Sequence, residues 1–361
     1  MIQATQRKDY YNPLISRTKN DERGVLLNSL LSSLQRTRGI AGALAQRAML
    51  KTGERKFDEA WTDLLAIHRL GRLVARGGTM IELLVGVAIN SIAYQADLAF
   101  LDRAKPDGKQ ALKYLQEFQR LLPLPTLAEK VELCERFVLL DIIQSTRKHG
   151  FESLRNLSND EDPEKADAAM QKALEQIDWD TIFRIANQPY DRVGKFLKLT
   201  GRAAREKEWA AFEKELREQK KNLGDNTNIV EMIKEGREFG KAVSEKIGTI
   251  LVTLLFPAVN RVQNAADRHD QQCHNLHLAF ALAAHRANHG KYPDKLAALA
   301  PKYLAKIPDD VFSGKPLIYT SNETGYLLYS VGENGKDDGG VSHYDEPRGD
   351  DLVVRMPSKT P

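Results

Sequence analysis

Residues 326–340 of this chain read YLLYSVGENGKDDGG, and residues 349–352 read GDDL. Segments rich in Tyr, Leu and Val, which are typical of strands, occur only after Pro316 and cover residues 317–320, 326–331 and 352–356. The glycines between them allow the tight turns that short connections need. The sequence therefore predicts a small group of strands around a loop rich in Gly and Asp.

Helical patterns occupy the rest of the chain. A long one covers Val259–Asn288, and five more lie between residues 21 and 149. The five are separated by short steps, which favour antiparallel neighbours: Thr52-Gly53, Gly77-Gly78, Pro106-Asp107 and Pro125-Thr126. We therefore expect an α+β protein, with a mainly α-helical N-terminal bundle followed by a small domain that carries the strands.

Pro257 is expected to end a helix, because proline lacks the N–H donor and its ring collides with the preceding turn. We place a domain boundary there. The predicted domains are a polar N-terminal tail at 1–20, a helical domain at 21–256 and a C-terminal domain at 257–361.

Composition excludes several classes of protein. The formal net charge of +4 over 361 residues gives no case for nucleic-acid binding. The longest apolar runs, Ile81–Ile89 and Ile250–Phe256, are much shorter than the roughly 20 residues that cross a bilayer, so no membrane span is expected within this chain. Cys134 and Cys273 lie far apart in the sequence and indicate no disulfide framework.

The C-terminal loop concentrates negative charge. It carries Asp337-Asp338 and Asp350-Asp351 close to Asn334. These carboxylates repel one another if they are brought together without a cation. Calcium takes six to eight oxygens from carboxylates, amides and carbonyls on a flexible backbone. The loop is thus a candidate calcium site, and the alternative is a solvated acidic turn.

The order of residues in this region resembles the C-terminal domain of the type II secretion major pseudopilin, which holds calcium in its final loop. The family pattern is Ser-x-Gly-x-Asp-Gly followed by Asp-x-Asp-Ile, and Asn334 stands here in place of the first aspartate. The resemblance covers about a quarter of the chain. The same region is also similar to the C-terminal part of large planctomycete proteins of unknown function. It is carried by Tyr292-Pro293, Pro308-Asp309, Phe312-Ser313-Gly314, Tyr326–Gly335 and Gly349-Asp350-Asp351-Leu352.

The resemblance implies a fold, a metal site and a function. A long helix should pack on a short antiparallel sheet through Leu276, Phe280, Leu282 and Ala283. The calcium ligands should come from Ser330, Asn334, Asp337, Asp338, Asp350 and Asp351. The function should be non-catalytic, in a structural or interaction protein of the envelope or of secretion that binds a protein partner or assembles with itself. A periplasmic or cell-envelope location follows, although no signal peptide is visible.

A second resemblance lies in residues 76–85, which read RGGTMIELLV and are similar to the prepilin processing motif. Glu82 would then be the glutamate that guides pilin assembly. Asn90, Gln95 and Asp97 follow in the same helical pattern and are unsuited to lipid. We therefore interpret the segment as a buried helix of the bundle.

A stripe of histidines and one cysteine gives the remaining alternatives. His269, Cys273, His277, His285 and His289 recur at steps of four residues or multiples of four along one helical pattern. Three of them could be zinc ligands, but the stripe drifts by ~40° at each step, so only neighbours converge. Polar surface or half-buried histidines are the favoured interpretation. The alternatives for function are a helical-bundle adaptor that binds a protein partner, and a metal-dependent enzyme that uses this stripe.

Overall fold

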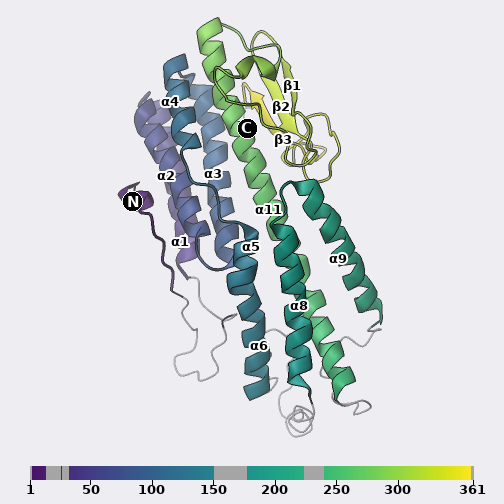
Figure 1. The fold of residues 1–361 in the computed structure, drawn as a ribbon. Helices are drawn as coiled ribbons and strands as arrows, with labels where there is room; N and C mark the ends of the chain where they lie inside the picture. The colour runs from purple at the N-terminus through teal and green to yellow at the C-terminus, as the bar shows by residue number, and fades with distance from the viewer. Residues whose placement is uncertain (1, 14–25, 27–31, 150–176, 223–239, 359–361) are drawn as a thin grey trace.

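The computed structural model describes residues 2–13, 26, 32–149, 177–222 and 240–358. Its helices run close to one common direction, and three strands lie at one end of the elongated molecule (Figure 1). Residues 14–20 of the predicted N-terminal tail lie outside the described residues. The α-helices are α1 (Ser32–Gly53), α2 (Phe57–Ala75), α3 (Met80–Ala104), α4 (Gly108–Gln119), α5 (Leu127–Lys130), α6 (Arg136–His149), α8 (Trp179–Leu197), α9 (Arg202–Asn222) and α11 (Lys241–His289).

Shorter elements complete the described chain. A 3-10 helix, η1, covers Ile2–Gln6, a π-helical turn covers Val131–Glu135, and a second 3-10 helix, η5, covers Leu296–Leu299. The strands are β1 (Ile318–Ser321), β2 (Tyr326–Ser330) and β3 (Leu352–Met356). The protein is thus mostly helical with a small sheet, and the predicted α+β class is confirmed at this level.

Capping residues open α3 and α4, two of the predicted helices. The Thr79 side chain accepts a hydrogen bond from the Glu82 N–H, and Glu82 caps the Thr79 N–H in return, so that a capping box opens α3. Asp107 and Gln110 form the same arrangement at the start of α4. These local motifs satisfy backbone donors that have no partner within a helix, and they fix where each helix begins.

The predicted helix break at Pro257 is wrong. α11 runs from Lys241 to His289 and passes through position 257 without interruption. Proline removes one helical hydrogen bond, at a cost of about 3 kcal/mol. Packing on both sides offsets this cost, because Phe256 and Val259 are buried in the same hydrophobic cluster. The division into domains at this position stays a prediction.

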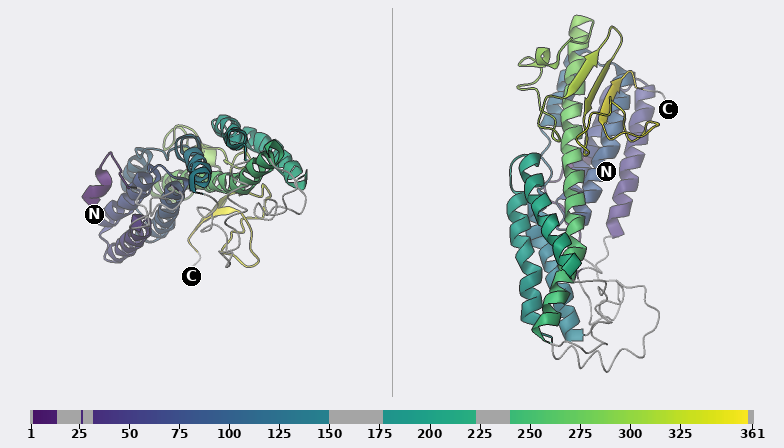
Figure 2. Two further views of the ribbon diagram at one scale, coloured as in Figure 1. Left: turned by 90° about the horizontal axis from the view of Figure 1, so that it is seen from below. Right: turned by 90° about the vertical axis from the view of Figure 1, so that its right-hand side faces the viewer.

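Two hydrophobic clusters share α11. The N-terminal half of α11 packs with α5, α8 and α9, and its C-terminal half packs with α3, α4 and the sheet. Figure 2 shows the sheet lying along the second half of this helix, away from α8 and α9. The bundle and the strands therefore belong to one continuous core at this end of the molecule.

The sheet is antiparallel with the order β1-β2-β3. Leu328 of β2 pairs with Val354 of β3, and both side chains are buried in the core that includes Leu276 and Leu282 of α11. Phe280 reaches the bundle, where its ring centroid lies 5.3 Å from that of Trp61. The helix predicted to cover the sheet thus contacts the sheet and the bundle at once.

Within the described residues, α3 is the one helix that is long and apolar enough to cross a bilayer. Of its most apolar 18-residue window, 56% is buried inside the protein. Its buried residues include Glu82, Asn90 and Asp97, which contact other parts of the chain. This packing fits the interpretation of α3 as a central helix of the bundle.

Candidate functional site

Asp310 ties the end of β2 to the turn at residues 308–316. Its buried carboxylate accepts hydrogen bonds from the Ser330 hydroxyl at 2.7 Å and from the Val331 N–H at 3.2 Å. The same carboxylate accepts from the Phe312 N–H at 2.9 Å and from the Ser313 hydroxyl at 2.9 Å. Ser330, a predicted calcium ligand, therefore uses its hydroxyl to anchor the base of the loop.

The sequence offered a partial signal for this anchor. Asp309-Asp310 reads as the start of a turn after Pro308, and the structure closes that turn with an isolated bridge between Asp309 and Pro316. The contact with Ser330 spans 20 residues and cannot be deduced from spacing.

Three predicted ligands, Asn334, Asp338 and Asp350, meet in the loop between β2 and β3. The Asn334 N–H donates to Asp350 Oδ2 at 2.7 Å, and the Asn334 side-chain amide donates to Asp338 Oδ2 at 3.2 Å. The Asp350 N–H donates to the same Asp338 oxygen at 2.8 Å. Both sides of the loop are thus held together by carboxylates that accept N–H donors.

Asp351 joins this arrangement from the buried side. It is almost fully buried, and its carboxylate accepts from the Gly340 N–H at 2.7 Å and from the Asp338 N–H at 3.4 Å. Burial raises the pKa of Asp351, and the negative charges of Asp338 and Asp337 add to the effect. Asp337 and Asp338 therefore lie close enough to Asp351 to act on it electrostatically.

Asp337 lies at the edge of the group. Its carboxylate accepts from the Tyr329 hydroxyl at 3.0 Å and from the Gly339 N–H at 2.9 Å. Burial and the neighbouring Asp337 carboxylate raise the pKa of Tyr329 to about 12, so the phenol stays a donor at neutral pH.

The loop requires glycine where its two sides approach. Gly332 has φ of +68°, and a Cβ atom there would lie 2.1 Å from the backbone oxygen of Asp350. Gly335 has the same φ, but a Cβ atom there would meet nothing within 4 Å. Gly332 is therefore needed for close packing as well as for its backbone conformation.

The predicted ligands thus occupy three environments. Asn334, Asp338, Asp350 and Asp351 form one hydrogen-bonded group, Asp337 lies beside Tyr329, and the Ser330 hydroxyl points to Asp310. Across the part of the chain that the structure describes, no three His, Cys, Asp or Glu side chains are arranged as a metal cluster. Calcium also takes carbonyl and amide oxygens, which such a cluster does not include.

The His/Cys stripe divides into separate places on α11. His269 Nε2 lies 3.5 Å from Cys273 Sγ, and desolvation lowers the pKa of His269 to about 3 and raises that of Cys273 to about 12. The ring of His277 packs against that of Phe118, with 5.2 Å between the ring centroids. Near the end of the helix, the rings of His285 and His289 stack on each other with their centroids 4.2 Å apart. Without a metal, the pKa shifts of His269 and Cys273 correspond to a neutral imidazole beside a protonated thiol, and a protonated thiol is a poor nucleophile.

A buried polar network between α2 and α3 was missed by the sequence analysis. His68 Nε2 lies 2.6 Å from Asp97 Oδ2, and His68 Nδ1 lies 3.1 Å from Asn90 Oδ1. Arg72 also donates to Asn90 Oδ1, at 2.6 Å. Burial raises the pKa of Asp97, although the neighbouring His68 lowers it in part. No motif signals this network, since its members are scattered over 30 residues and each fits an ordinary helix.

Glu82 has a structural part in the bundle. Besides its capping role, its carboxylate accepts a hydrogen bond from the Asn12 amide at 3.0 Å. Glu82 is buried at the start of α3, and this environment supports the interpretation as a bundle helix.

Comparison with known proteins does not identify a family for this chain. No protein-family model matches the chain, and no curated protein or solved structure matches it either. The pseudopilin resemblance therefore rests on the residues alone and stays a prediction.

Proposed function

We propose that this protein is a non-catalytic structural or interaction protein of the cell envelope or of a secretion system, and that calcium stabilises its C-terminal loop. The observation that carries the proposal is the hydrogen-bonded group in the loop between β2 and β3, in which the N–H groups of Asn334, Asp350 and Asp338 donate to the carboxylates of Asp350, Asp338 and Asp351, respectively. Hydrogen bonds from N–H groups leave the negative charge of these carboxylates in place, and a divalent cation would offset two of the three charges.

Within this proposal, Asp338, Asp350 and Asp351 supply the negative charge and Asn334 supplies a neutral amide oxygen. Asp337 adds charge at the edge, and Ser330 positions the loop through Asp310. Modest calcium sites of extracellular modules have dissociation constants of about 10⁻⁴–10⁻³ M and are filled outside the cell. Calcium binding to the folded state alone would add directly to stability.

An exposed aromatic residue supports the interaction role. Tyr344 lies in the same loop and is 83% exposed, and its ring lies 5.8 Å from that of His343. Aromatic residues are enriched where proteins bind one another. A calcium-ordered loop would present Tyr344 to a protein partner or to a second copy of the chain.

The adaptor function remains a second candidate because apolar side chains are exposed on the bundle. Leu133 is 73% exposed and Phe137 is 53% exposed, and they lie one helical turn apart. Ile81 of α3, 56% exposed, is close by, since the Met80 N–H donates to Glu135 at 2.8 Å.

Sedimentation equilibrium of the wild type and of a Leu133→Ser, Phe137→Ser variant tests self-association through this surface. A monomer in both cases argues against self-assembly there.

Thermal unfolding in calcium and in chelator tests the proposed function. At a calcium concentration ten times the dissociation constant, we expect the midpoint to rise by about 2–3 °C. Asp350→Asn should remove most of this rise. Glu323→Gln removes one exposed negative charge from the β1–β2 turn and serves as the matched control, which should keep the rise. An equal rise with magnesium, or the same midpoint in calcium and chelator, would contradict the proposal.

A further inference from the structure

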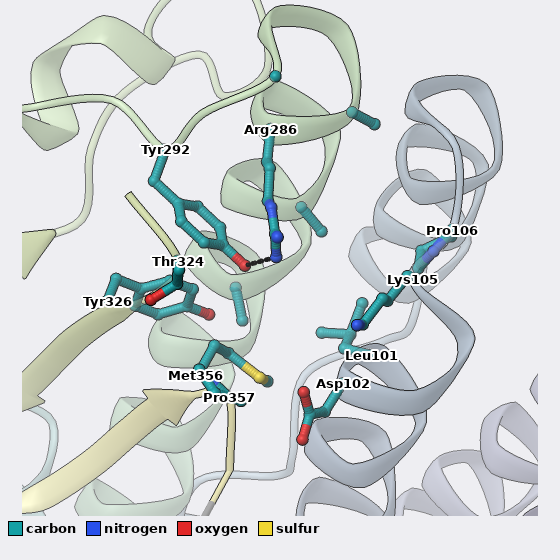
Figure 3. A pocket seen from close by; sticks show the side chains of 14 residues that line it. Leu101, Asp102, Lys105, Pro106, Arg286, Tyr292, Thr324, Tyr326, Met356 and Pro357 are labelled. Carbon is teal, nitrogen blue, oxygen red and sulfur yellow. Dashed lines mark hydrogen bonds between the residues drawn. The ribbon is translucent and has the colours of Figure 1, made fainter. Parts of the chain in front are cut away.

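A pocket of about 490 Å³ lies between the end of α3, the last turns of α11 and the sheet (Figure 3). Its volume is within the range of small-molecule sites, which is roughly 300–1,000 Å³. Much of its wall is apolar and comes from Leu101, Ala279, Ala283, Met356 and Pro357. The wall therefore suits the apolar body of a ligand.

Two cations reach into this pocket from different helices. Arg286 of α11 donates to the Tyr292 hydroxyl at 3.1 Å, and its guanidinium lies 4.9 Å from the centroid of the Tyr292 ring. Lys105 follows the end of α3, and Figure 3 shows its side chain directed toward the same space. Among the described residues, neither cation forms an ion pair with a carboxylate. Arg286 is thus fixed in place, with further N–H donors left for a ligand.

Tyr326 adds a buried donor. Its side chain is only 5% exposed, and its hydroxyl points toward the pocket (Figure 3). Burial raises the pKa of Tyr326 well above its usual value, so the phenol stays protonated. A hydroxyl that faces a pocket in this way can donate a hydrogen bond to an acceptor on a bound molecule.

Asp102 limits the charge of the ligand. Its carboxylate accepts from the Ser358 N–H at 3.0 Å and from the Ser358 hydroxyl at 2.5 Å. It lines the pocket opposite Arg286 (Figure 3). With Lys105 and Arg286, the pocket carries two positive charges and one negative charge. A ligand with one negative charge makes the pocket neutral, whereas a second negative charge would be repelled by the Asp102 carboxylate.

We propose that this pocket binds a small monocarboxylate with an apolar body. The carboxylate accepts hydrogen bonds from the planar Arg286 guanidinium and from the Tyr326 hydroxyl, with Lys105 nearby. The apolar body lies against Leu101 and Met356. This site is separate from the acidic loop and does not depend on calcium.

Isothermal titration of the full chain with sodium octanoate in the presence of chelator tests the site. We expect one octanoate per chain, and weaker binding of octylamine and of succinate. Arg286→Gln should weaken octanoate binding about 10- to 100-fold, since hydrogen bonds to a charged group are lost. Arg103→Gln changes the same charge on an exposed position of α3 and should leave binding unchanged.

Tyr326→Phe is the second variant, since it removes the hydroxyl and keeps the ring that packs 4.8 Å from that of Tyr292. We expect about 10-fold weaker binding from this change. The proposal is overturned if octanoate does not bind the wild type, if octylamine binds equally well, or if Tyr326→Phe binds octanoate as the wild type does. Because chelator is present throughout, these outcomes leave the calcium proposal untouched.

Discussion

The Ser330 hydroxyl donates a 2.7 Å hydrogen bond to Asp310, whose carboxylate is buried between the end of β2 and the preceding turn. This contact joins two segments that the sequence shows only as separate motifs. It holds the base of the acidic loop against the turn at residues 308–316.

Replacing Asp310 by Ala should destabilise the protein by about 2–4 kcal/mol. The change leaves the Ser330 and Ser313 hydroxyls and the Phe312 and Val331 N–H groups without their acceptor, and each unsatisfied buried donor costs about 1–3 kcal/mol before relaxation. Urea unfolding measures the loss. Asp309→Ala is the control, because that carboxylate lies at the surface, 3.5 Å from Lys306. Equal losses for the two variants would show that the anchor is unimportant.

Replacing Gly332 by Ala should cost more than replacing Gly335 by Ala. Both positions have φ of +68°, so each substitution carries the left-handed penalty of about 1–2 kcal/mol. Only at 332 does the new Cβ collide with the backbone oxygen of Asp350. Thermal unfolding in chelator compares the two variants directly, and a larger loss for Gly335→Ala would contradict the loop geometry.

Acid should destabilise the folded state through His269. Desolvation lowers the pKa of this buried imidazole to about 3, compared with about 6.5 in an unfolded chain. The unfolded state therefore binds the proton first as the pH falls. The stability from this group is complete above about pH 6.5 and is lost as the pH falls toward 3, with a slope of up to about 1.4 kcal/mol per pH unit.

The variant His269→Gln should lose less stability than the wild type between pH 7 and pH 5, as measured by urea unfolding at both values. His343→Gln, at an exposed position of the loop, is the matched control and should keep the wild-type pH dependence. An unchanged slope in His269→Gln would mean that this imidazole does not resist protonation in the folded protein.

Local patterns predicted the elements well. The strand patterns at 317–320, 326–331 and 352–356 differ from β1, β2 and β3 by at most one residue at each end. The Gly77-Gly78 step separates α2 from α3, where Thr79 and Glu82 supply the cap. In these cases the information lies within a few neighbouring residues.

The features that local patterns did not predict depend on tertiary packing. The intrinsic preference of proline predicted a helix end at 257, but residues of one hydrophobic cluster are buried on both sides of this position in α11, among them Phe256 and Val259. The His68–Asp97 contact and the pocket beside Tyr326 combine residues from segments far apart in the chain. In the candidate loop, composition indicated which residues are acidic. It did not indicate the N–H groups that donate to them or the contact of Asp310 with Ser330.

Isothermal titration of chelator-treated protein with calcium chloride measures whether the acidic loop binds calcium. We predict one calcium per chain in the millimolar range or tighter. Binding should be lost in the variant Asp338→Asn, Asp350→Asn and retained in Glu323→Gln. Two results would contradict calcium binding by this loop. One is a binding heat that is identical in the wild type and both variants, and the other is the absence of binding at calcium concentrations several-fold above the millimolar range.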